Sequence, residues 1–386
     1  MRIGIIGAGH AGVEAAGRAS SRGAEAVLFS KESVLPYYRP RVVALAFGQV
    51  EPDAIHIKPA DWYEKNGIDL RLDCPVTHLD VQEKTAVARE QQEAFDALVL
   101  ATGATPVVLP LARDFPEDAI ALWDVERSLA IRDKLGAARR LVVLGGGISG
   151  VEAALYAVDA GLEVTVVEKA NCLMPMQSGP NAAAVLANRL REKGIRLLLG
   201  RCAESISREP HGLKIALNDS EAVPCDLVVT TVGARRELAI FERAGLRTDK
   251  GVLVDDCLRT SASGVFACGD VAQRNGTRTA SVMNAVQQGR GAGANAVASL
   301  QGQELEAVPA AVVPLSLKHG DIELYAAGPP QGEGLEERTL SEREASAYRS
   351  VLLQDGILRG VQMVGTREGF HQLVAEIGRP WRPAQG

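Results

Sequence analysis

The feature that most constrains the fold is a strand, glycine loop and helix unit that occurs twice. The first copy runs from Arg2-Ile3-Gly4-Ile5-Ile6 into Gly7-Ala8-Gly9-His10-Ala11-Gly12, and the second from Arg140-Leu141-Val142-Val143-Leu144 into Gly145-Gly146-Gly147-Ile148-Ser149-Gly150. Each copy leads to a second strand-like run, at 26–29 and 164–167, and each half ends on a similar exit, at 95–103 and 225–233. Such internal similarity indicates two copies of one βαβ plan, so the sequence predicts an α/β protein with two Rossmann-like domains.

The glycine spacing predicts dinucleotide binding in both copies. In a G-x-G-x-x-G loop the first glycine permits a tight turn, the second lets the backbone approach a pyrophosphate, and the third lets the helix sit close to the sheet. The helix N-terminus then favours phosphate groups. A lone loop of this kind is a weak signal, but here both copies follow a strand and open a helix. The predicted contacts are Gly7, Gly9, His10, Ala11 and Gly12 in the first copy, and Gly145, Gly147, Ile148, Ser149 and Gly150 in the second.

The residue that ends the second strand of each copy indicates the nucleotide. A carboxylate there accepts hydrogen bonds from a ribose and repels a 2′-phosphate, so Glu168 favours NADH over NADPH. The equivalent residue of the first copy is Ser30, with Glu32 two residues later. Glu32 is a candidate ribose ligand, and its alternative is a solvated loop carboxylate. His10 is expected to be a bystander and not an acid–base group, because hydride transfer needs orientation more than proton transfer.

Bulk properties exclude several function classes. The net charge of −6 gives no support to nucleic-acid binding. The six cysteines lie far apart, without a CxxC or CxxxxC pair, so neither a thiol relay nor a cysteine-based metal site is expected. No apolar run approaches the roughly 20 residues that cross a bilayer. The sequence therefore predicts no metal, no membrane association and a cytoplasmic location.

A third motif adds a family resemblance. Gly251-Val252-Leu253-Val254-Asp255-Asp256 leads through Arg259-Thr260-Ser261 to Gly264-Val265-Phe266-Ala267-Cys268-Gly269-Asp270. With the two loops and their exits, this resembles the FAD-dependent pyridine nucleotide–disulfide oxidoreductase superfamily over residues 1 to 300. The resemblance implies that Asp270 binds the ribityl chain of FAD and that Gln288 lies near the isoalloxazine. It also implies cofactor contacts at Val76, Ala101, Thr102, Gly103, Gly233 and Gly269.

The branch within the superfamily is indicated by Leu35-Pro36-Tyr37-Tyr38-Arg39-Pro40-Arg41, which contains no cysteine. This segment looks like the rubredoxin reductase, flavorubredoxin reductase and nitrite reductase flavin-subunit branch, which lacks the redox disulfide. Electrons would then leave from the flavin itself. The resemblance makes Arg39 or Arg41 the candidate cation near the flavin, paired with Glu152. A surface arginine and a solvated helix glutamate remain the alternatives, and no general base is assigned.

The resemblance also implies a domain plan and an activity. The FAD-binding domain is expected at 1–110 and 238–308, the NAD-binding domain at 111–237, and a small α+β domain at 309–386. In the last piece, Asp355-Gly356 predicts a hairpin turn and residues around His371 a short helix. The expected activity is NADH-dependent reduction of a small electron carrier such as rubredoxin, by a monomer or homodimer. The alternatives are an NADH oxidase that reduces oxygen directly and a non-catalytic redox sensor resembling apoptosis-inducing-factor relatives.

Overall fold

The computed structural model describes residues 1–275, 281–309, 312–343 and 347–382, which form two compact units. Unit 1 comprises Met1–Arg39, Glu51–Thr105 and Ala234–Ala311, and unit 2 comprises Pro40–Val50, Pro106–Gly233 and Val312–Gly386. Most of the predicted NAD-binding range 111–237 and most of the predicted C-terminal range 309–386 therefore fall in unit 2. The segment Pro40–Val50, from the predicted FAD-binding range, also clusters with unit 2.

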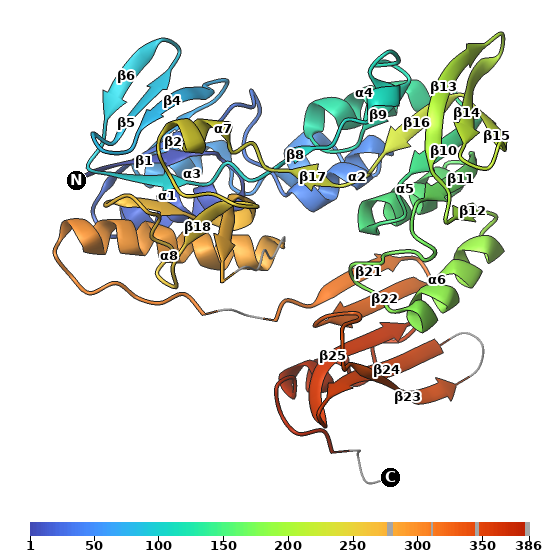
Figure 1. Cartoon of the computed structure of the whole chain (residues 1–386). Coiled ribbons are helices and arrows are strands. Elements are labelled where there is room, and N and C mark those ends of the chain that lie inside the picture. Colours follow the sequence, from blue (N-terminus) through green and yellow to red (C-terminus); the bar gives the residue numbers. More distant parts are fainter. Residues whose placement is uncertain (276–280, 310–311, 344–346, 383–386) are drawn as a thin grey trace. The chain divides into compact units, whose positions relative to one another are not determined.

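Unit 1 is built on a five-stranded parallel sheet (Figure 1). Its order is β19-β7-β1-β2-β3, from β1 (Arg2–Ile6), β2 (Glu25–Phe29), β3 (Ile68–Arg71), β7 (Ala97–Leu100) and β19 (Val265–Ala267). Ile3 and Ile5 pack with helices α1 (His10–Ser21) and α8 (Val282–Leu300) on one face. Ile6 packs on the other face, against the three-stranded antiparallel sheet of β4 (Val76–Asp80), β5 (Thr85–Ala88) and β6 (Gln91–Ala94).

Helices α1 and α8 pack at close range because small residues line their contact. A Cβ at Gly289 would lie 2.2 Å from the Ala11 carbonyl oxygen, and one at Gly293 would lie 2.3 Å from that of Ala15. No larger residue fits at either position without a shift of backbone. Unit 1 also contains η2 (Pro52–Ile55), α3 (Ala60–Lys65), β17 (Ala234–Arg235), α7 (Ala239–Arg243), η4 (Gly269–Val271), and β18 (Val252–Val254) paired in parallel with β20 (Ala272–Arg274).

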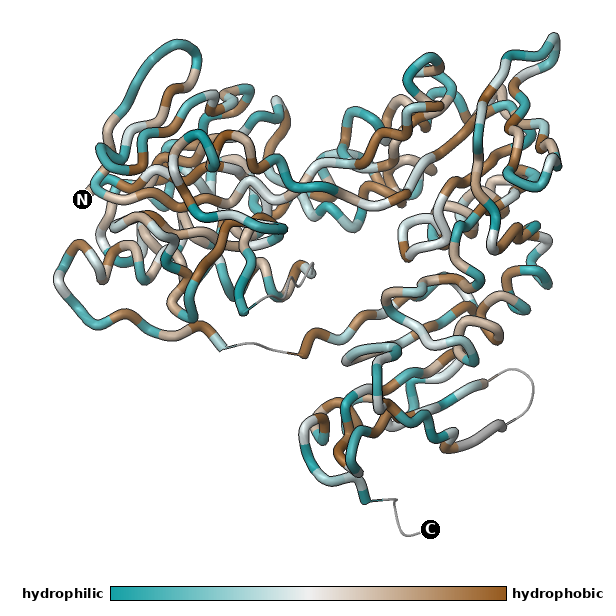
Figure 2. Tube along the Cα trace, in the orientation of Figure 1, coloured by the Kyte–Doolittle hydropathy of each residue, from teal (hydrophilic) through white to brown (hydrophobic). Residues whose placement is uncertain are grey.

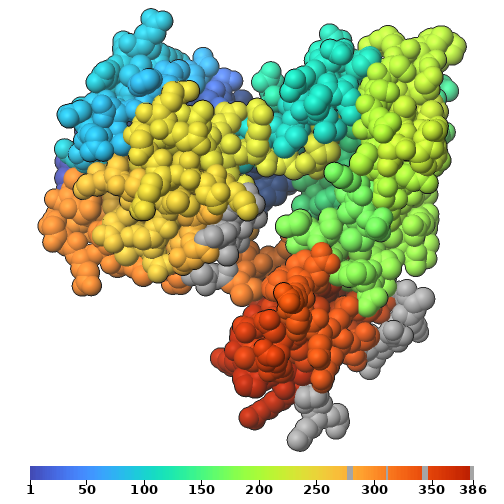
Figure 3. All heavy atoms as spheres, in the orientation of Figure 1, coloured from blue at the N-terminus to red at the C-terminus, as the bar shows by residue number. Residues whose placement is uncertain are grey.

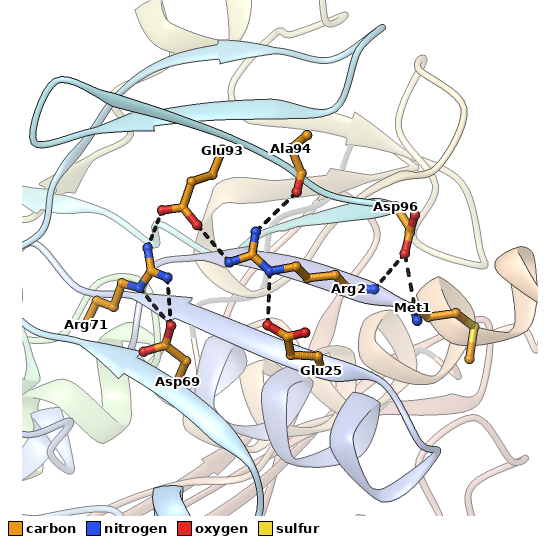
Figure 4. A network of polar contacts seen from close by, with 8 residues as sticks. All are labelled: Met1, Arg2, Glu25, Asp69, Arg71, Glu93, Ala94 and Asp96. Atoms are coloured by element: carbon orange, nitrogen blue, oxygen red, sulfur yellow. Dashed lines mark hydrogen bonds and ion pairs between the residues drawn. The ribbon is translucent and has the colours of Figure 1, made fainter.

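An ion-pair network joins β6 to β1, β2 and β3 of the parallel sheet (Figure 4). Arg2 Nη2 donates to Glu93 Oε2 at 2.7 Å and Arg2 Nε to Glu25 Oε1 at 3.0 Å. Arg71 pairs with the other oxygen of Glu93 and with Asp69. The hydrogen bonds of Arg71 and Arg2 lower the pKa of the Glu93 carboxyl. These ion pairs therefore link the antiparallel sheet to the parallel one. Removing one charged side chain would deprive each of its partners of an ion pair.

Unit 2 contains a second parallel sheet of matching design. Its order is β12-β11-β10-β16-β9, from β9 (Ala119–Ala121), β10 (Arg140–Leu144), β11 (Glu163–Glu168), β12 (Arg196–Leu199) and β16 (Leu227–Thr230). A three-stranded antiparallel sheet of β13 (Ala203–Glu209), β14 (Gly212–Leu217) and β15 (Ala222–Cys225) again shares a hydrophobic core with it. Helices α2 (Val42–Ala46), α4 (Val125–Leu135), α5 (Ile148–Asp159) and α6 (Pro180–Glu192) belong to this unit. The short piece η3 (Pro110–Ala112) also belongs to this unit, whereas η1 (Arg39–Arg41) and β8 (Thr105–Pro106) each include residues of both units.

The repeat seen in the sequence extends to the start of each central strand. Asp96 Oδ2 accepts the Arg2 N–H at 2.7 Å, and Asp226 Oδ2 accepts the Arg140 N–H at 2.9 Å. The N–H groups of the same two aspartates donate to the carbonyls of Arg2 and Arg140, at 2.8 and 2.9 Å. Each exit segment thus closes back on the first residue of its own β1-like strand. The prediction of two copies of one plan is confirmed.

The C-terminal part of unit 2 is an antiparallel sheet of order β21-β22-β25-β24-β23. Its strands are β21 (Leu315–His319), β22 (Ile322–Ala327), β23 (Glu336–Arg343), β24 (Ala347–Gln354) and β25 (Ile357–Val364). The predicted Asp355-Gly356 turn joins β24 to β25, and the predicted short helix is α9 (Phe370–Ala375). In Figure 2 hydrophobic stretches fall on parts of this sheet, whereas the sequence of β23, EERTLSER, is mostly hydrophilic. Within the described part of the chain, no helix is long and apolar enough to span a bilayer.

Candidate functional site

The first glycine loop folds so tightly that side chains are excluded at two of its positions. Gly7 has a φ of +108°, and a Cβ there would lie 2.4 Å from the Ala101 carbonyl oxygen. A Cβ at Gly12 would lie 1.8 Å from the Gly7 carbonyl oxygen. The loop therefore requires glycine at both places, and it packs directly on the exit segment that carries Ala101, Thr102 and Gly103.

The second loop repeats this geometry in unit 2. Gly145 has a φ of +112°, and its N–H donates to the Val167 carbonyl at 2.8 Å, as Gly7 does to Phe29 at 2.9 Å. A Cβ at Gly150 would lie 1.9 Å from the Gly145 carbonyl oxygen. Because the two loops share dihedral angles, partners and close approaches, both present the same kind of binding surface.

Both loops fit a phosphate-containing cofactor. The N-cap residues of α1 and α5 are Gly9 and Gly147, which have no side chain to cap the first N–H groups of either helix. A Cβ at either glycine would meet no described atom within 4 Å, so the packing of the protein itself does not demand glycine there. Open backbone before the positive end of a helix is the arrangement that binds pyrophosphate.

The carboxylate of Glu168 is held at the second loop by backbone N–H groups. Gly146 N–H donates to Glu168 Oε2 at 2.5 Å, and Ala170 N–H donates to Oε1 at 2.7 Å. Each oxygen keeps a further lone pair, so Glu168 can still accept from ribose hydroxyls. Gly146 has a role that the spacing pattern did not reveal, since a Cβ there would lie 3.0 Å from the Glu168 Cβ and 2.9 Å from Leu173 Cδ2.

In unit 1 the candidate Glu32 is engaged by two neighbours from the Leu35–Arg41 segment. Its Oε1 accepts from Arg39 Nη2 at 2.9 Å, and its Oε2 accepts from the Tyr37 hydroxyl at 2.7 Å. The Arg39 guanidinium also lies 5.1 Å from the centre of the Tyr37 ring. The structure therefore brings together Glu32 and Arg39, two residues that were assigned from separate motifs.

The Gly269-Asp270 motif begins η4, and Gln288 on α8 supports it. Gln288 Oε1 accepts the Gly269 N–H at 2.9 Å, and the Gln288 side chain is buried. Burial raises the pKa of Asp270, and the positive charges of Arg236 and Arg39 partly oppose that shift. Arg236 Nε also donates to the Asp270 carbonyl at 2.5 Å. Arg236 is a second residue that sequence reasoning missed, because it lies outside every motif.

Arg41 and Glu152 line one pocket of unit 2, a cavity of about 370 Å³. Tyr156, one helical turn after Glu152 on α5, lines it as well. Burial alone raises the pKa of Glu152 to about 7. Among the residues that the structure describes, none forms a hydrogen bond or ion pair with the Glu152 carboxylate. The pairing with a cation that the resemblance implies stays a prediction.

His10 and Val76 occupy different settings. His10 begins α1, meets Tyr38 edge-on at 5.0 Å, and has its pKa lowered to about 4, chiefly by burial. Its Nε2 is buried with no hydrogen-bond partner among the described residues. A neutral imidazole is consistent with the expectation of a bystander. Val76 begins β4 and packs on the core of that face, and Gly233 follows β16 at the end of the second exit.

Known proteins resemble this chain along most of its length. The family model of pyridine nucleotide-disulphide oxidoreductases matches residues 1–289. The rubredoxin–NAD(+) reductase of Pseudomonas putida is 36% identical over 299 residues, covering 75% of this chain and 78% of that protein. The assimilatory nitrate reductase electron transfer subunit of Bacillus subtilis is 27% identical over 359 residues, which are 92% of this chain and 46% of the relative. The chain thus spans about half the length of that relative. Among solved structures, a ferredoxin reductase from Rhodopseudomonas palustris is 26% identical, with a TM-score of 0.88 over 98% of this chain and 96% of that one.

Proposed function

The chain belongs to the pyridine nucleotide-disulphide oxidoreductase family, and on that premise we propose that it passes electrons from NADH through FAD to a small iron-containing carrier protein. Membership confirms the predicted family, the fold class and the use of FAD with a nicotinamide nucleotide. The observation that carries the choice of acceptor lies beside the predicted flavin residues. Cys268 precedes Gly269-Asp270, is fully buried, and has its pKa raised to about 12 by burial.

A buried, protonated thiol is a poor electron relay, because the thiolate is the reactive form. The segment Leu35–Arg41 contains no cysteine that could serve as a relay. Neither Cys268 nor the Leu35–Arg41 segment therefore offers a cysteine intermediate for electrons that leave the flavin. A rubredoxin is the acceptor named for the Pseudomonas putida relative, and the same class of acceptor fits this chain.

The residues of unit 1 would hold FAD by complementary contacts. The loop at Gly7–Gly12 would bind the pyrophosphate, Glu32 the ribose, and Asp270 the ribityl chain. Ser281 caps α8 by accepting the Asn284 N–H at 3.1 Å, which fixes where that helix begins. The positive end of α8 would then stabilise negative charge on a bound flavin. FAD held by these residues would supply two-electron chemistry toward NADH and one-electron chemistry toward the carrier.

The residues of unit 2 would hold NADH in the same manner. The loop at Gly145–Gly150 would bind its pyrophosphate and Glu168 its ribose. These contacts orient the nucleotide, and orientation is what hydride transfer requires of the protein. Residues Arg41 and Glu152 are proposed to lie at the nicotinamide end, where they line a shared pocket.

The test is anaerobic turnover of the FAD-loaded protein with NADH and a rubredoxin. We expect bleaching of the rubredoxin at a rate that rises and saturates with its concentration. In a separate aerobic assay without the carrier, oxygen consumption should be at least about tenfold slower than reduction of the rubredoxin. Fast oxygen consumption without the carrier would favour an NADH oxidase. A reduced protein that persists in the presence of every carrier would favour a redox sensor, and either result would remove the proposal.

A further inference from the structure

Unit 1 contains a cavity that shares no residue with the predicted cofactor contacts. It measures about 530 Å³ and is bordered by α1, α8 and the stretch that carries Lys58 and Trp62. Part of the segment that includes α8, drawn in orange, lies at the surface of unit 1 in Figure 3. Neither the glycine loop nor the Gly269-Asp270 motif accounts for this cavity. Its function is therefore inferred from the side chains that line it.

The rim of this cavity carries three cations from three segments: Arg18 on α1, Lys58 before α3, and Arg290 on α8. Two carboxylates, Glu14 and Glu306, also line it. Arg290 Nε lies 2.6 Å from Glu14 Oε2, but the Glu14 side chain is only 16% exposed, whereas that of Arg290 is 62% exposed. The guanidinium therefore faces solvent in front of the carboxylate. The Glu306 side chain is 78% exposed, and its Oε1 lies 3.7 Å from Arg22 Nη2. With three lining cations against two lining carboxylates, the rim carries net positive charge on a chain whose net charge is −6.

An aromatic side chain lies among these cations. Lys58 Nζ is 5.1 Å from the centre of the Trp62 ring, and Trp62 remains partly exposed. Trp and Arg are the residues most enriched where protein partners bind tightly. Positive charge around an indole is the composition of an interface for a negatively charged protein.

The cavity lies on the same helices as the predicted flavin contacts. Glu14 follows the glycine loop within the first turns of α1. Arg290 follows Gln288 by two residues on α8, and Gln288 binds the Gly269 N–H. A protein seated here would contact the two helices whose N-terminal ends border the proposed FAD site. An electron-accepting partner bound at these helices would lie near the proposed FAD site.

We propose that this cationic cavity is the docking surface for the electron carrier, and that the carrier presents a carboxylate-rich face to it. The inference rests on the proposed function, since it names where the acceptor of that reaction binds. Complementary charge would steer encounter and raise the association rate, and salt would weaken it.

The experiment reverses these charges one at a time. Arg290→Glu, Lys58→Glu and Arg18→Glu are each assayed with NADH and, as the probe, a rubredoxin of negative net charge at low ionic strength. We expect kcat/KM for the rubredoxin to fall about tenfold in each variant, with the difference vanishing in about 0.5 M salt. Reduction of a small uncharged quinone should be unchanged, which shows that FAD and NADH are still bound. The matched control is Arg243→Glu, an exposed arginine of α7 in the same unit that does not line the cavity. It should leave both activities as they are.

The outcomes separate the two proposals. If the unaltered protein reduces rubredoxin and the three variants do so equally well, the docking surface is wrong and the proposed function stands. If the unaltered protein reduces the quinone but no acidic carrier, both are wrong. A change in molecular mass from dimer to monomer in the variants would show that the cavity binds a second copy of this chain, which also overturns the docking proposal.

Discussion

Two backbone N–H groups, those of Gly146 and Ala170, hold the Glu168 carboxylate at the second glycine loop, where we propose that it binds the ribose of NADH. A 2′-phosphate at that place would meet a fixed negative charge. We expect kcat/KM to favour NADH over NADPH by at least tenfold, or about 1.4 kcal/mol. Glu168→Arg should shift the ratio toward NADPH, while Glu163→Arg, at the exposed start of the same strand, should not. Equal values for the two nucleotides in the unaltered protein would mean that Glu168 does not contact the ribose.

Glu152 carries a pH dependence of folding stability. Its pKa rises from 4.5 in the unfolded chain to about 7 in the folded one, because burial disfavours the charge. Between these values the folded protein binds a proton that the unfolded chain does not, so this residue's contribution is complete below pH 4.5 and is lost as pH rises through 7. Glu152→Gln should therefore gain stability relative to the unaltered protein between pH 5 and 8, on the order of 1–2 kcal/mol. Denaturant unfolding at pH 5 and at pH 8 measures this difference, with Glu192→Gln, at an exposed position of α6, as the control. A pH-independent difference would show that Glu152 is charged throughout.

The close packing of helix α1 against helix α8 limits the size of the side chains that fit between them. Gly293→Ala places a methyl group against the Ala15 carbonyl, so the helices must separate. We expect a loss of unfolding free energy of about 1–3 kcal/mol and weaker FAD retention. Gly136→Ala is the matched control, because its φ is −64° and a Cβ there meets no described atom within 4 Å. That variant should be neutral or more stable by up to about 1 kcal/mol. Equal stability of the two variants would show that the helices can adjust.

Local sequence patterns predicted the strands, loops and helices of the candidate site, because the residues that determine each of these elements lie within the element itself. The strands before both glycine loops, the loops, and the helices after them are continuous in sequence, and so is the Asp355-Gly356 hairpin. Residues that reach the site from elsewhere were not predictable in this way. Arg236 meets the Asp270 carbonyl across 34 positions of sequence, and Gly146 matters because of where the Glu168 side chain lies. Such contacts depend on packing between elements, which no periodicity records.

For the whole molecule, the electron capacity should equal that of the flavin alone. Cys268 is buried and protonated, and Cys74 and Cys225 are buried as well. An anaerobic titration should therefore reach its endpoint near one NADH per FAD, without a long-wavelength thiolate–flavin band. Alkylation of the accessible thiols should leave reduction of a one-electron dye intact. Uptake of a second equivalent would require a cysteine in contact with the flavin and would return the chain to the disulfide-reducing branch.

The alternation of the two units along the chain has a consequence for biosynthesis. A ribosome releases residues in order, and the sheet of unit 1 needs β19, which emerges only after all of β9 to β16. The parallel sheet of unit 2 can therefore be paired while the first segments of unit 1 still lack their edge strand and helix α8. During that interval the apolar face of β1 is covered by α1 and by earlier residues such as Tyr63, but not yet by α8. Chaperone binding during synthesis is expected to concentrate on this face and to end once α8 has been made.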